Sequence, residues 1–385
     1  MKTYLVGGAV RDALLGRTPT ERDWVVVGGR AEDLERAGYK RVGRDFPVFL
    51  HPETGEEYAL ARTERKAGHG YHGFEVHAGP EVTLKEDLGR RDLTINAMAQ
   101  DTDGTLIDPY GGRADLEARL LRHVSPAFVE DPLRVLRVAR FAARYRPLGF
   151  RVAPETGALM RRMVADGELD WLVPERVWRE TERALGERAP ACYFDELAAC
   201  GALSIVFPEL APLFADPPSV AGRSALDAAA AAGEPEPVRF AALCHALDAD
   251  GPLAALCERL PVPKAFAEPA CLTARWEAVI AGGADNDAAT LWAVLRDCDA
   301  LRRPERFERV LAACAAVAQA RGDTAFAAGD ALRAARAAAS GVDAGALARD
   351  GWQGAALGRE LERRRCAAVA ATLDGGGRGR GTRSE

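Results

Sequence analysis

Two acidic side chains near the start of the chain have the spacing of a metal site. Glu21 and Asp23 directly precede the apolar run of residues 24–27. Side chains alternate along a β-strand, so two carboxylates separated by one residue at a strand start point the same way. Such a pair can hold the divalent cations that support in-line phosphoryl transfer, and Mg²⁺ favours one or two carboxylates together with phosphate oxygens. A solvated acidic turn is the alternative interpretation.

A third carboxylate and a glycine turn could belong to the same site. Glu57 begins another alternating segment, and on a neighbouring strand it could complete the metal site or accept a hydroxyl proton. An exposed charge at a strand start is the alternative for Glu57. Gly7 and Gly8 separate an apolar run from a helical segment that carries Arg11 one turn in. Such a junction lets backbone N–H groups approach a triphosphate, although many glycine turns serve only to reverse the chain.

The elements that would position these residues fall into two kinds. Short apolar runs bounded by glycine, proline or charge predict strands at residues 4–6, 24–27, 48–50 and 57–63. After residue 130 the apolar positions recur at helical spacing, and the chain is rich in Ala, Leu, Arg and Glu. The sequence therefore predicts an α+β head followed by all-helical domains.

Four motifs follow one another in an order that resembles a known family. They are GGAVRD at residues 7–12, the acidic pair at 21–23, RRDLTINA at 90–97 and EDPLRVLR at 130–137. The head resembles the polymerase-β nucleotidyltransferase superfamily. Over residues 1–210 the chain resembles, more narrowly, the class II, bacterial-type CCA-adding enzymes (tRNA nucleotidyltransferases), in their proteobacterial multifunctional form.

The resemblance implies a domain order and an activity. It implies a nucleotidyltransferase head at 1–125, a nucleobase- and tRNA-binding neck at 126–215, a helical body and tail at 216–372, and a disordered tail at 373–385. The implied activity is template-independent addition of CCA to the 3′ end of tRNA from CTP and ATP, with Mg²⁺ as cofactor and pyrophosphate as product.

The resemblance also implies a role for each residue that matches a motif. Glu21 and Asp23 would hold the metal and, with Glu57, serve catalysis. Nucleotide binding would fall to seven residues: Gly8, Arg11, Arg91, Asp131, Arg134, Arg137 and Arg140. The arginine fork suits phosphate oxygens, and the arginines after residue 133 form a helical stripe with no acidic residue four positions on.

Asp131 and Arg134 match the family's base-reading motif. A carboxylate can accept from the exocyclic amino group that cytosine and adenine share, whereas guanine and uracil present a carbonyl there. One Asp/Arg pair could therefore select C and A without a template. Asp131 before Pro132 would also make a good helix N-cap, and both roles can hold at once.

The glycine-rich segment at residues 64–80 matches a family loop that is needed for the switch from CTP to ATP. Its presence favours complete CCA addition over addition of CC alone. His69, His72 and His77 lie in or near it, but their spacing is irregular for zinc and no cysteine is close.

Two positions depart from the family pattern. The acidic pair is usually Asp-x-Asp, whereas the first member here is Glu21. Multifunctional relatives often carry a helical HD phosphohydrolase domain, but only His245 of the six histidines lies beyond residue 123. Ala246 stands where the metal-binding aspartate of that domain would be. The sequence thus predicts a degenerate HD region without phosphohydrolase activity.

Composition limits the class of protein. The net charge is −6, so any RNA contact must use local basic patches and not bulk charge. No apolar run reaches membrane-spanning length and no signal peptide is evident, which predicts a cytoplasmic protein without a membrane partner, as a monomer or homodimer. All eight cysteines follow residue 190 without C-x-x-C spacing, as expected for reduced core thiols.

Two alternative functions remain open from the sequence. A bacterial poly(A) polymerase shares the head motifs, although this chain lacks a long basic C-terminal extension. A catalytically impaired tRNA-binding relative would explain the replacement of the usual aspartate by Glu21.

Overall fold

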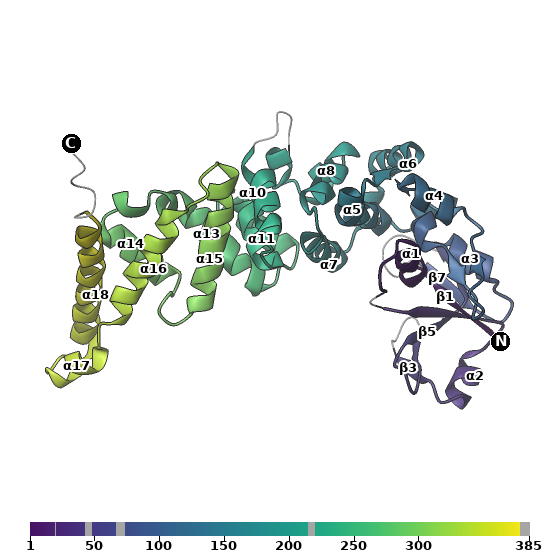
Figure 1. Cartoon of the computed structure of the whole chain (residues 1–385), viewed down its shortest axis with the longest axis horizontal. Coiled ribbons are helices and arrows are strands. Elements are labelled where there is room, and N and C mark those ends of the chain that lie inside the picture. The colour runs from purple at the N-terminus through teal and green to yellow at the C-terminus, as the bar shows by residue number, and fades with distance from the viewer. Residues whose placement is uncertain (20, 43–47, 67–73, 215–219, 378–385) are drawn as a thin grey trace. The chain divides into compact units, whose positions relative to one another are not determined.

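The computed structural model describes residues 1–19, 21–42, 48–66, 74–214 and 220–377 (Figure 1). Contacts within the chain divide it into two compact units, Met1–Val206 and Phe207–Glu385. The first unit combines a sheet with helices, and the described part of the second is helical. The predicted fold class, an α+β head followed by helical domains, is confirmed.

A seven-stranded sheet organises the head, in the order β3-β4-β5-β2-β1-β8-β9. Its strands are β1 (Lys2–Val6), β2 (Asp23–Val27), β3 (Lys40–Val42), β4 (Val48–Leu50), β5 (Glu57–Leu60), β8 (Ala99–Gln100) and β9 (Leu106–Ile107). Only the β2–β5 pair in this sheet is parallel. The strands predicted at 4–6, 24–27 and 48–50 are confirmed, and the segment predicted at 57–63 divides at Ala61 into β5 and the start of β6.

The other four described strands form two sheets of two strands each. β6 (Arg62–Lys66) and β7 (Phe74–Ala78) form an antiparallel hairpin, whose connection at 67–73 lies outside the described residues. β10 (Leu120–Leu121) pairs in parallel with β11 (Arg151–Val152).

Helices make up most of the rest of the first unit. They are α1 (Gly8–Leu14), α2 (Ala31–Arg36), α3 (Leu84–Gly89), α4 (Gly112–Ala118), α5 (Leu133–Tyr145), α6 (Pro154–Ala165), α7 (Pro174–Leu185), α8 (Ala191–Ala199) and α9 (Leu203–Val206). Alternate residues of β1 enter different apolar clusters, Tyr4 and Val6 in one and Leu5 in another. Apolar side chains are therefore buried on both faces of the sheet.

The turn between β1 and α1 requires glycine. Gly7 has φ 67° and ψ −122°, a conformation that L side chains rarely adopt. A Cβ atom at Gly7 would lie 2.8 Å from Nη1 of Arg91. The missing side chain thus lets an arginine approach the backbone at the start of α1.

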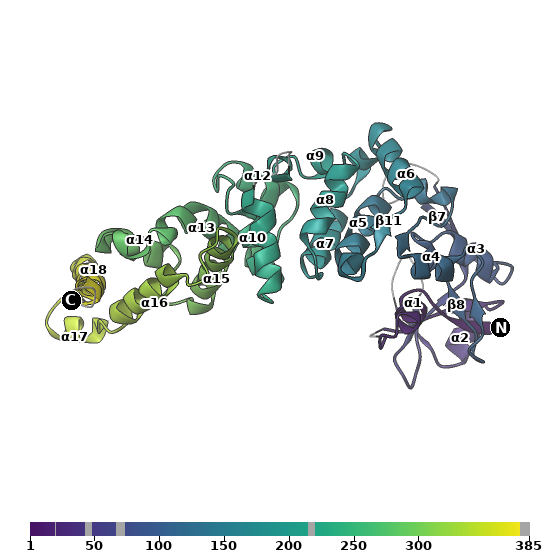
Figure 2. The same ribbon diagram turned by 45° about the horizontal axis from the view of Figure 1, so that its top comes forward.

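The second unit contains α10 (Val220–Ala231), α11 (Glu236–Cys244), α12 (Pro252–Arg259), α13 (Lys264–Ala281), α14 (Ala288–Asp297), α15 (Pro304–Ala320), α16 (Ala327–Ser340), α17 (Ala344–Arg349) and α18 (Gly354–Gly377). In Figure 2, α13 and α15 lie side by side, in agreement with their direct contact. Its core gathers apolar side chains such as Leu295, Phe307 and Val369.

Several further sequence expectations concern this part of the chain. All eight cysteines are free thiols, five of them buried. α18 continues past residue 373 to Gly377, and residues 378–385 of the predicted disordered tail lie outside the described residues. Within the part of the chain that the structure describes, no helix is both long and apolar enough to cross a bilayer.

Candidate active site

Strand pairing brings the predicted acidic residues to one edge of the head sheet. In the parallel β2–β5 pair Asp23 lies opposite Glu57, and in the antiparallel β1–β2 pair it lies opposite Val6. Glu21 lies two residues before Asp23, just outside the strand. The acidic residues therefore adjoin the glycine turn that begins at Gly7.

A cavity of about 940 Å³ opens over this edge. All ten site residues predicted from the sequence line it: Gly8, Arg11, Glu21, Asp23, Glu57, Arg91, Asp131, Arg134, Arg137 and Arg140. Its lining contains ten arginines and six carboxylates, and every lining residue belongs to the first unit. The cavity is thus rich in positive charge although the whole chain carries −6.

The acidic side of the cavity suits a hard cation. Burial raises the pKa of Asp23; the charge of Arg91 opposes this shift, and the charge of Glu21 adds to it. A divalent cation would relieve the repulsion between the two carboxylates. No group of three or more His, Cys, Asp or Glu side chains that could hold a metal is found among the described residues. A cation held by Glu21 and Asp23 would therefore draw further ligands from water or substrate phosphate, as Mg²⁺ commonly does.

Arg91 lies near Asp23, and two hydrogen bonds fix its guanidinium group. Its Nη2 donates to Asp87 at 3.2 Å and its Nη1 to the backbone oxygen of Asn96 at 3.4 Å. Asp87 is fully buried and also accepts from Arg90 at 2.7 Å. Burial alone would raise the pKa of Asp87, but the two arginines hold it below its usual value. This anchored carboxylate fixes where both guanidinium groups lie.

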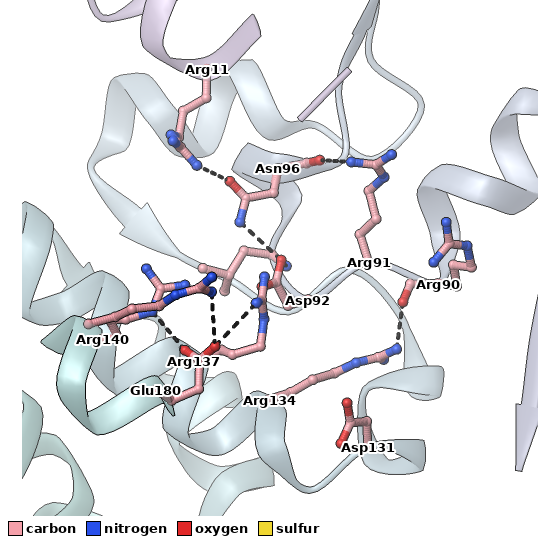
Figure 3. A network of polar contacts seen from close by, with 12 residues as sticks. Arg11, Arg90, Arg91, Asp92, Asn96, Asp131, Arg134, Arg137, Arg140 and Glu180 are labelled. Atoms are coloured by element: carbon pink, nitrogen blue, oxygen red, sulfur yellow. Dashed lines mark hydrogen bonds and ion pairs between the residues drawn. The ribbon is translucent and has the colours of Figure 1, made fainter. Parts of the chain in front are cut away.

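Arg11 has a more enclosed position than the sequence indicated. Its guanidinium donates to the side-chain oxygen of Asn96 (Figure 3). It also donates, at 3.0 and 3.2 Å, to the carboxylate of Asp12. It also lies over the rings of Phe141 and Tyr145, at 5.5 and 5.3 Å from their centroids. Arg11 therefore joins α1 to α5 while forming part of the cavity wall.

Asp92 is a buried link between the RRDLTINA motif and α5. It accepts from Arg137 Nε at 2.8 Å, from Asn96 Nδ2 at 3.0 Å and from the backbone N–H of Leu93 at 2.8 Å. Burial by itself would raise the pKa of Asp92, but the charge of Arg137 and these hydrogen bonds hold it well below its ordinary value. The charge of Asp92 in turn raises the pKa of Arg137. The pair is thus ionised on both sides.

The arginines of α5 have no acidic residue four positions on, but two of them pair with carboxylates from other parts of the chain. Glu180 of α7 accepts from Arg140 Nε at 2.7 Å and lies 3.7 Å from Arg137 Nη1. Glu187 lies 3.5 Å from Arg140 Nη1, and burial raises its pKa although nearby arginines oppose that shift. Both carboxylates are at least 40 residues away from Arg140 in the sequence, so the i to i+4 pattern of α5 does not indicate them.

The two residues that the sequence predicts to read the base, Asp131 and Arg134, lie at the start of α5. Asp131 accepts from Arg176 Nη2 at 2.9 Å and Nη1 at 3.4 Å. It also accepts from the backbone N–H of Leu133, the first residue of α5, at 3.1 Å. Asp131 therefore caps this end of the helix with its side chain, although Pro132 and not Asp131 stands at the N-cap position. Arg134 donates to the backbone oxygens of Ala127 and Arg90, each at 2.6 Å. Both side chains are therefore oriented by the surrounding protein.

Sequence reasoning missed the residues that support this site: Asp87, Asp92, Asn96, Arg176 and Glu180. Two of them, Asp92 and Asn96, stood inside a recognised motif at helical spacing. Arg176 and Glu180 are likewise four residues apart on α7, a spacing that puts both on one helix face. That spacing was the available signal.

The glycine-rich segment is only partly described. Its flanks form the β6–β7 hairpin, whereas residues 67–73, with His69 and His72, lie outside the described residues. His77 pairs with Glu81.

Two family models match parts of the first unit. The family model "Poly A polymerase head domain" matches residues 3–122, and "Probable RNA and SrmB-binding site of polymerase A" matches residues 149–214. A relative named "Multifunctional CCA protein" from Thioalkalivibrio sulfidiphilus is 52% identical over 400 aligned positions, covering 96% of this chain and 98% of the relative. A "CCA-adding enzyme" from Pseudomonas putida is 52% identical, covering 96% and 99%.

Solved structures share the fold. A CCA-adding enzyme in an apo form matches with a TM-score of 0.71 at 22% identity, covering 98% of this chain and 91% of that one. A CCA-adding enzyme in complex with CTP matches with a TM-score of 0.67 at 23% identity, covering 99% and 92%. These likenesses extend over the whole of the chain and not only over the head.

Proposed function

Since the chain belongs to the family of CCA-adding enzymes, we propose that it adds the sequence CCA to the 3′ end of tRNA from CTP and ATP and releases pyrophosphate. The convergence of the ten sequence-predicted residues on one cavity carries this proposal. Enzymes of the same fold have been solved with CTP, with ATP and with tRNA, which supports the same substrates here. We further propose a cytoplasmic monomer or homodimer, which light scattering of the purified protein would test.

Glu21 and Asp23 are the residues that would hold Mg²⁺. When bound, the ion supplies Lewis-acid stabilisation of charge on the phosphate oxygens. Glu57, opposite Asp23 in the neighbouring strand, accepts the proton of the tRNA 3′-hydroxyl. That oxygen attacks the α-phosphate in line, and pyrophosphate leaves.

The basic side of the cavity binds the triphosphate. Backbone groups at Gly8 and the side chains of Arg11, Arg91, Arg137 and Arg140 supply donors for its oxygens. Their carboxylate partners, described above, limit the side-chain motion that would otherwise be lost on binding. The arginines are thus oriented before the nucleotide arrives.

Asp131 and Arg134 select the base. The Asp131 carboxylate accepts from the amino group of cytosine or adenine, and Arg134 donates to the neighbouring ring atom. A carbonyl of guanine or uracil at the same point would face the carboxylate and leave both acceptors without a donor. The segment at 64–80 would serve the change from CTP to ATP.

We also propose that the second unit has no HD phosphohydrolase activity. His245 is buried, its Nδ1 lies 2.8 Å from the backbone oxygen of Ala242, and burial lowers its pKa. It is the sole histidine of that unit, so several histidine ligands cannot gather there. Assays with p-nitrophenyl phosphate and 2′,3′-cyclic AMP in the presence of Ni²⁺ should show no turnover.

The test of the main proposal is timed extension of a tRNA that lacks its last three nucleotides. With CTP and ATP the product should stop after three additions, and with CTP alone after two. With ATP alone it should not be extended. A long A tail would instead support a poly(A) polymerase. Product formation no faster than that of the Asp23→Ala variant would support an inactive tRNA-binding protein.

A further inference from the structure

A second basic cavity lies in the second unit, separate from the catalytic one. It occupies about 360 Å³ where α13 and α15 begin, and Figure 1 shows these helices as neighbours. Its lining includes five cationic side chains: Lys264, Arg302, Arg303, Arg306 and Arg309. Only two carboxylates, Glu268 and Glu305, line it. An excess of positive charge on an acidic chain indicates a ligand that is an anion.

Three of the arginines are held in place by the protein. Arg306 donates to the backbone oxygen of Cys298 at 3.1 Å and to Glu268 at 3.2 Å. Arg302 donates to Asp299 at 2.9 and 3.1 Å, and Arg303 lies 3.5 Å from Glu268. These contacts orient the three guanidinium groups along one side of the cavity.

The two remaining cations have no such partner. The side chains of Lys264 and Arg309 make no hydrogen bond or ion pair with any described residue of the chain. Lys264 is the first residue of α13, which spans 18 residues, and Pro304 and Glu305 begin α15, which spans 17. The N-terminal end of α13 adds partial positive charge beside Lys264, and Arg309 lies in the second turn of α15.

The size and openness of the cavity restrict the anion. A volume of about 360 Å³ is at the low end for a site that encloses a whole small molecule, so a phosphate group fits better than a complete nucleotide. Arg302 and Arg303 at the rim are largely exposed, with side-chain exposures of 84% and 59%. A phosphate that is part of a longer polymer could therefore enter with its chain continuing outside.

We propose that this cavity binds a backbone phosphate of the RNA substrate through Lys264 and Arg309. The inference rests on the proposed function and adds a contact to tRNA outside the catalytic cavity. It also meets the requirement that an acidic chain bind RNA through local basic patches.

The test measures tRNA affinity across a series of KCl concentrations, with the full-length Lys264→Gln/Arg309→Gln double variant against the unaltered protein. Loss of the contact should weaken tRNA binding by about tenfold near 0.1 M salt. It should also lower the slope of log Kd against log salt by about one. Arg309→Lys, which keeps the charge, should restore most of the slope.

Arg359→Gln is the matched control, because Arg359 is exposed on α18 and has no partner among the described residues. Circular dichroism and CTP binding without tRNA check that the variants are folded. A double variant whose tRNA affinity and salt slope equal those of Arg359→Gln would overturn the inference alone.

A separate titration with inorganic phosphate distinguishes the two sources of the anion. If phosphate raises the melting temperature of the unaltered protein but not of the double variant, while tRNA binding is unchanged, the cavity takes a free phosphate and the RNA assignment is overturned. If the unaltered protein neither binds nor extends tRNA, the proposed function fails together with this inference.

Discussion

The carboxylates that line the cavity differ in how well the protein stabilises their negative charge. The proposed metal ligands Glu21 and Asp23 repel each other. Burial and mutual repulsion oppose the charged form of Asp23, so this position favours a compensating cation. Asp92 is in the opposite situation, because Arg137, Asn96 and a backbone N–H all stabilise its charge. The surroundings of Asp23 therefore suit a bound cation, whereas those of Asp92 suit an ion pair within the protein.

The length of the Glu21 side chain should affect the rate. Glu21→Asp withdraws the carboxylate by one methylene and restores the usual family residue, so we expect faster CCA addition with Mg²⁺ and a smaller preference for Mn²⁺. Asp23→Ala should lower the rate by at least about 10²-fold. Glu53→Ala, which removes an exposed charge away from the cavity, should leave the rate unchanged. Equal rates for Asp23→Ala and Glu53→Ala would exclude Asp23 from catalysis.

Removal of the Asp92 charge should destabilise the first unit. Asp92→Asn removes the nearer of the two ionised partners of Arg137 and leaves Glu180 at 3.7 Å, so the cost should lie at or below the low end of the about 3–5 kcal/mol for breaking a buried pair. The folded pKa of Asp92 lies below its unfolded value, so its contribution is present at neutral pH. That contribution is lost as pH falls below about 4 towards the folded pKa. Urea unfolding at pH 7 and pH 3 measures both effects. A variant as stable as the unaltered protein at pH 7 would contradict this role.

Side chains of α7 contact α5 at two places. Its Glu180 contacts Arg137 and Arg140 in the middle of α5, and its Arg176 contacts Asp131 at the start. The two helices also pack directly against each other. The start of α5, proposed to read the base, and its middle, proposed to bind phosphate, both contact one neighbouring helix.

Loss of the Arg176 contact should reduce base selectivity more than catalysis. Without it the Asp131 carboxylate can rotate, so we expect discrimination of CTP and ATP against UTP and GTP to fall by about tenfold, or ~1.4 kcal/mol. Arg176→Met tests this by the ratio of kcat/KM values for the four nucleotides. Arg179→Met, an exposed change on the same helix, is the control. Parallel losses with all four nucleotides would show that Arg176 has only a structural role.

The elements and the predicted site residues could be derived from the sequence to different degrees. β1, β2, β4 and α5 follow from local apolar periodicity, and motif order anticipated which residues line the cavity. The partners of those residues could not be derived. Glu180 lies 40 residues from Arg140, and Arg137 lies 45 residues from Asp92, so only the folded chain brings them together. The four-residue spacing of Arg176 and Glu180 puts both on one face of α7, but it does not identify the partner of either.

At the scale of the whole molecule, the chain consists of two units with their own apolar clusters. Every residue that lines the catalytic cavity belongs to the first unit, whereas the second basic cavity lies entirely in the other. The proposed nucleotide site and the proposed additional RNA contact therefore lie in different units.

This division predicts the behaviour of the separated units. A fragment of residues 1–206 should unfold cooperatively and bind CTP with an affinity close to that of the full chain, because its cavity is complete. The same fragment should bind tRNA more weakly. Circular dichroism and calorimetry provide the measurements, and the fragment of residues 207–385 serves as the control without a CTP site. A folded 1–206 fragment that fails to bind CTP would contradict the assignment of the cavity to the first unit.

The most direct test of the account is a crystal of the full-length protein grown with a non-hydrolysable CTP analogue and Mn²⁺ in place of Mg²⁺. We expect an anomalous peak that places a manganese ion against the carboxylates of Glu21 and Asp23 and against phosphate oxygens of the nucleotide. The cytosine amino group should donate to Asp131. A nucleotide bound in this cavity with both acidic side chains turned away from the metal would contradict it.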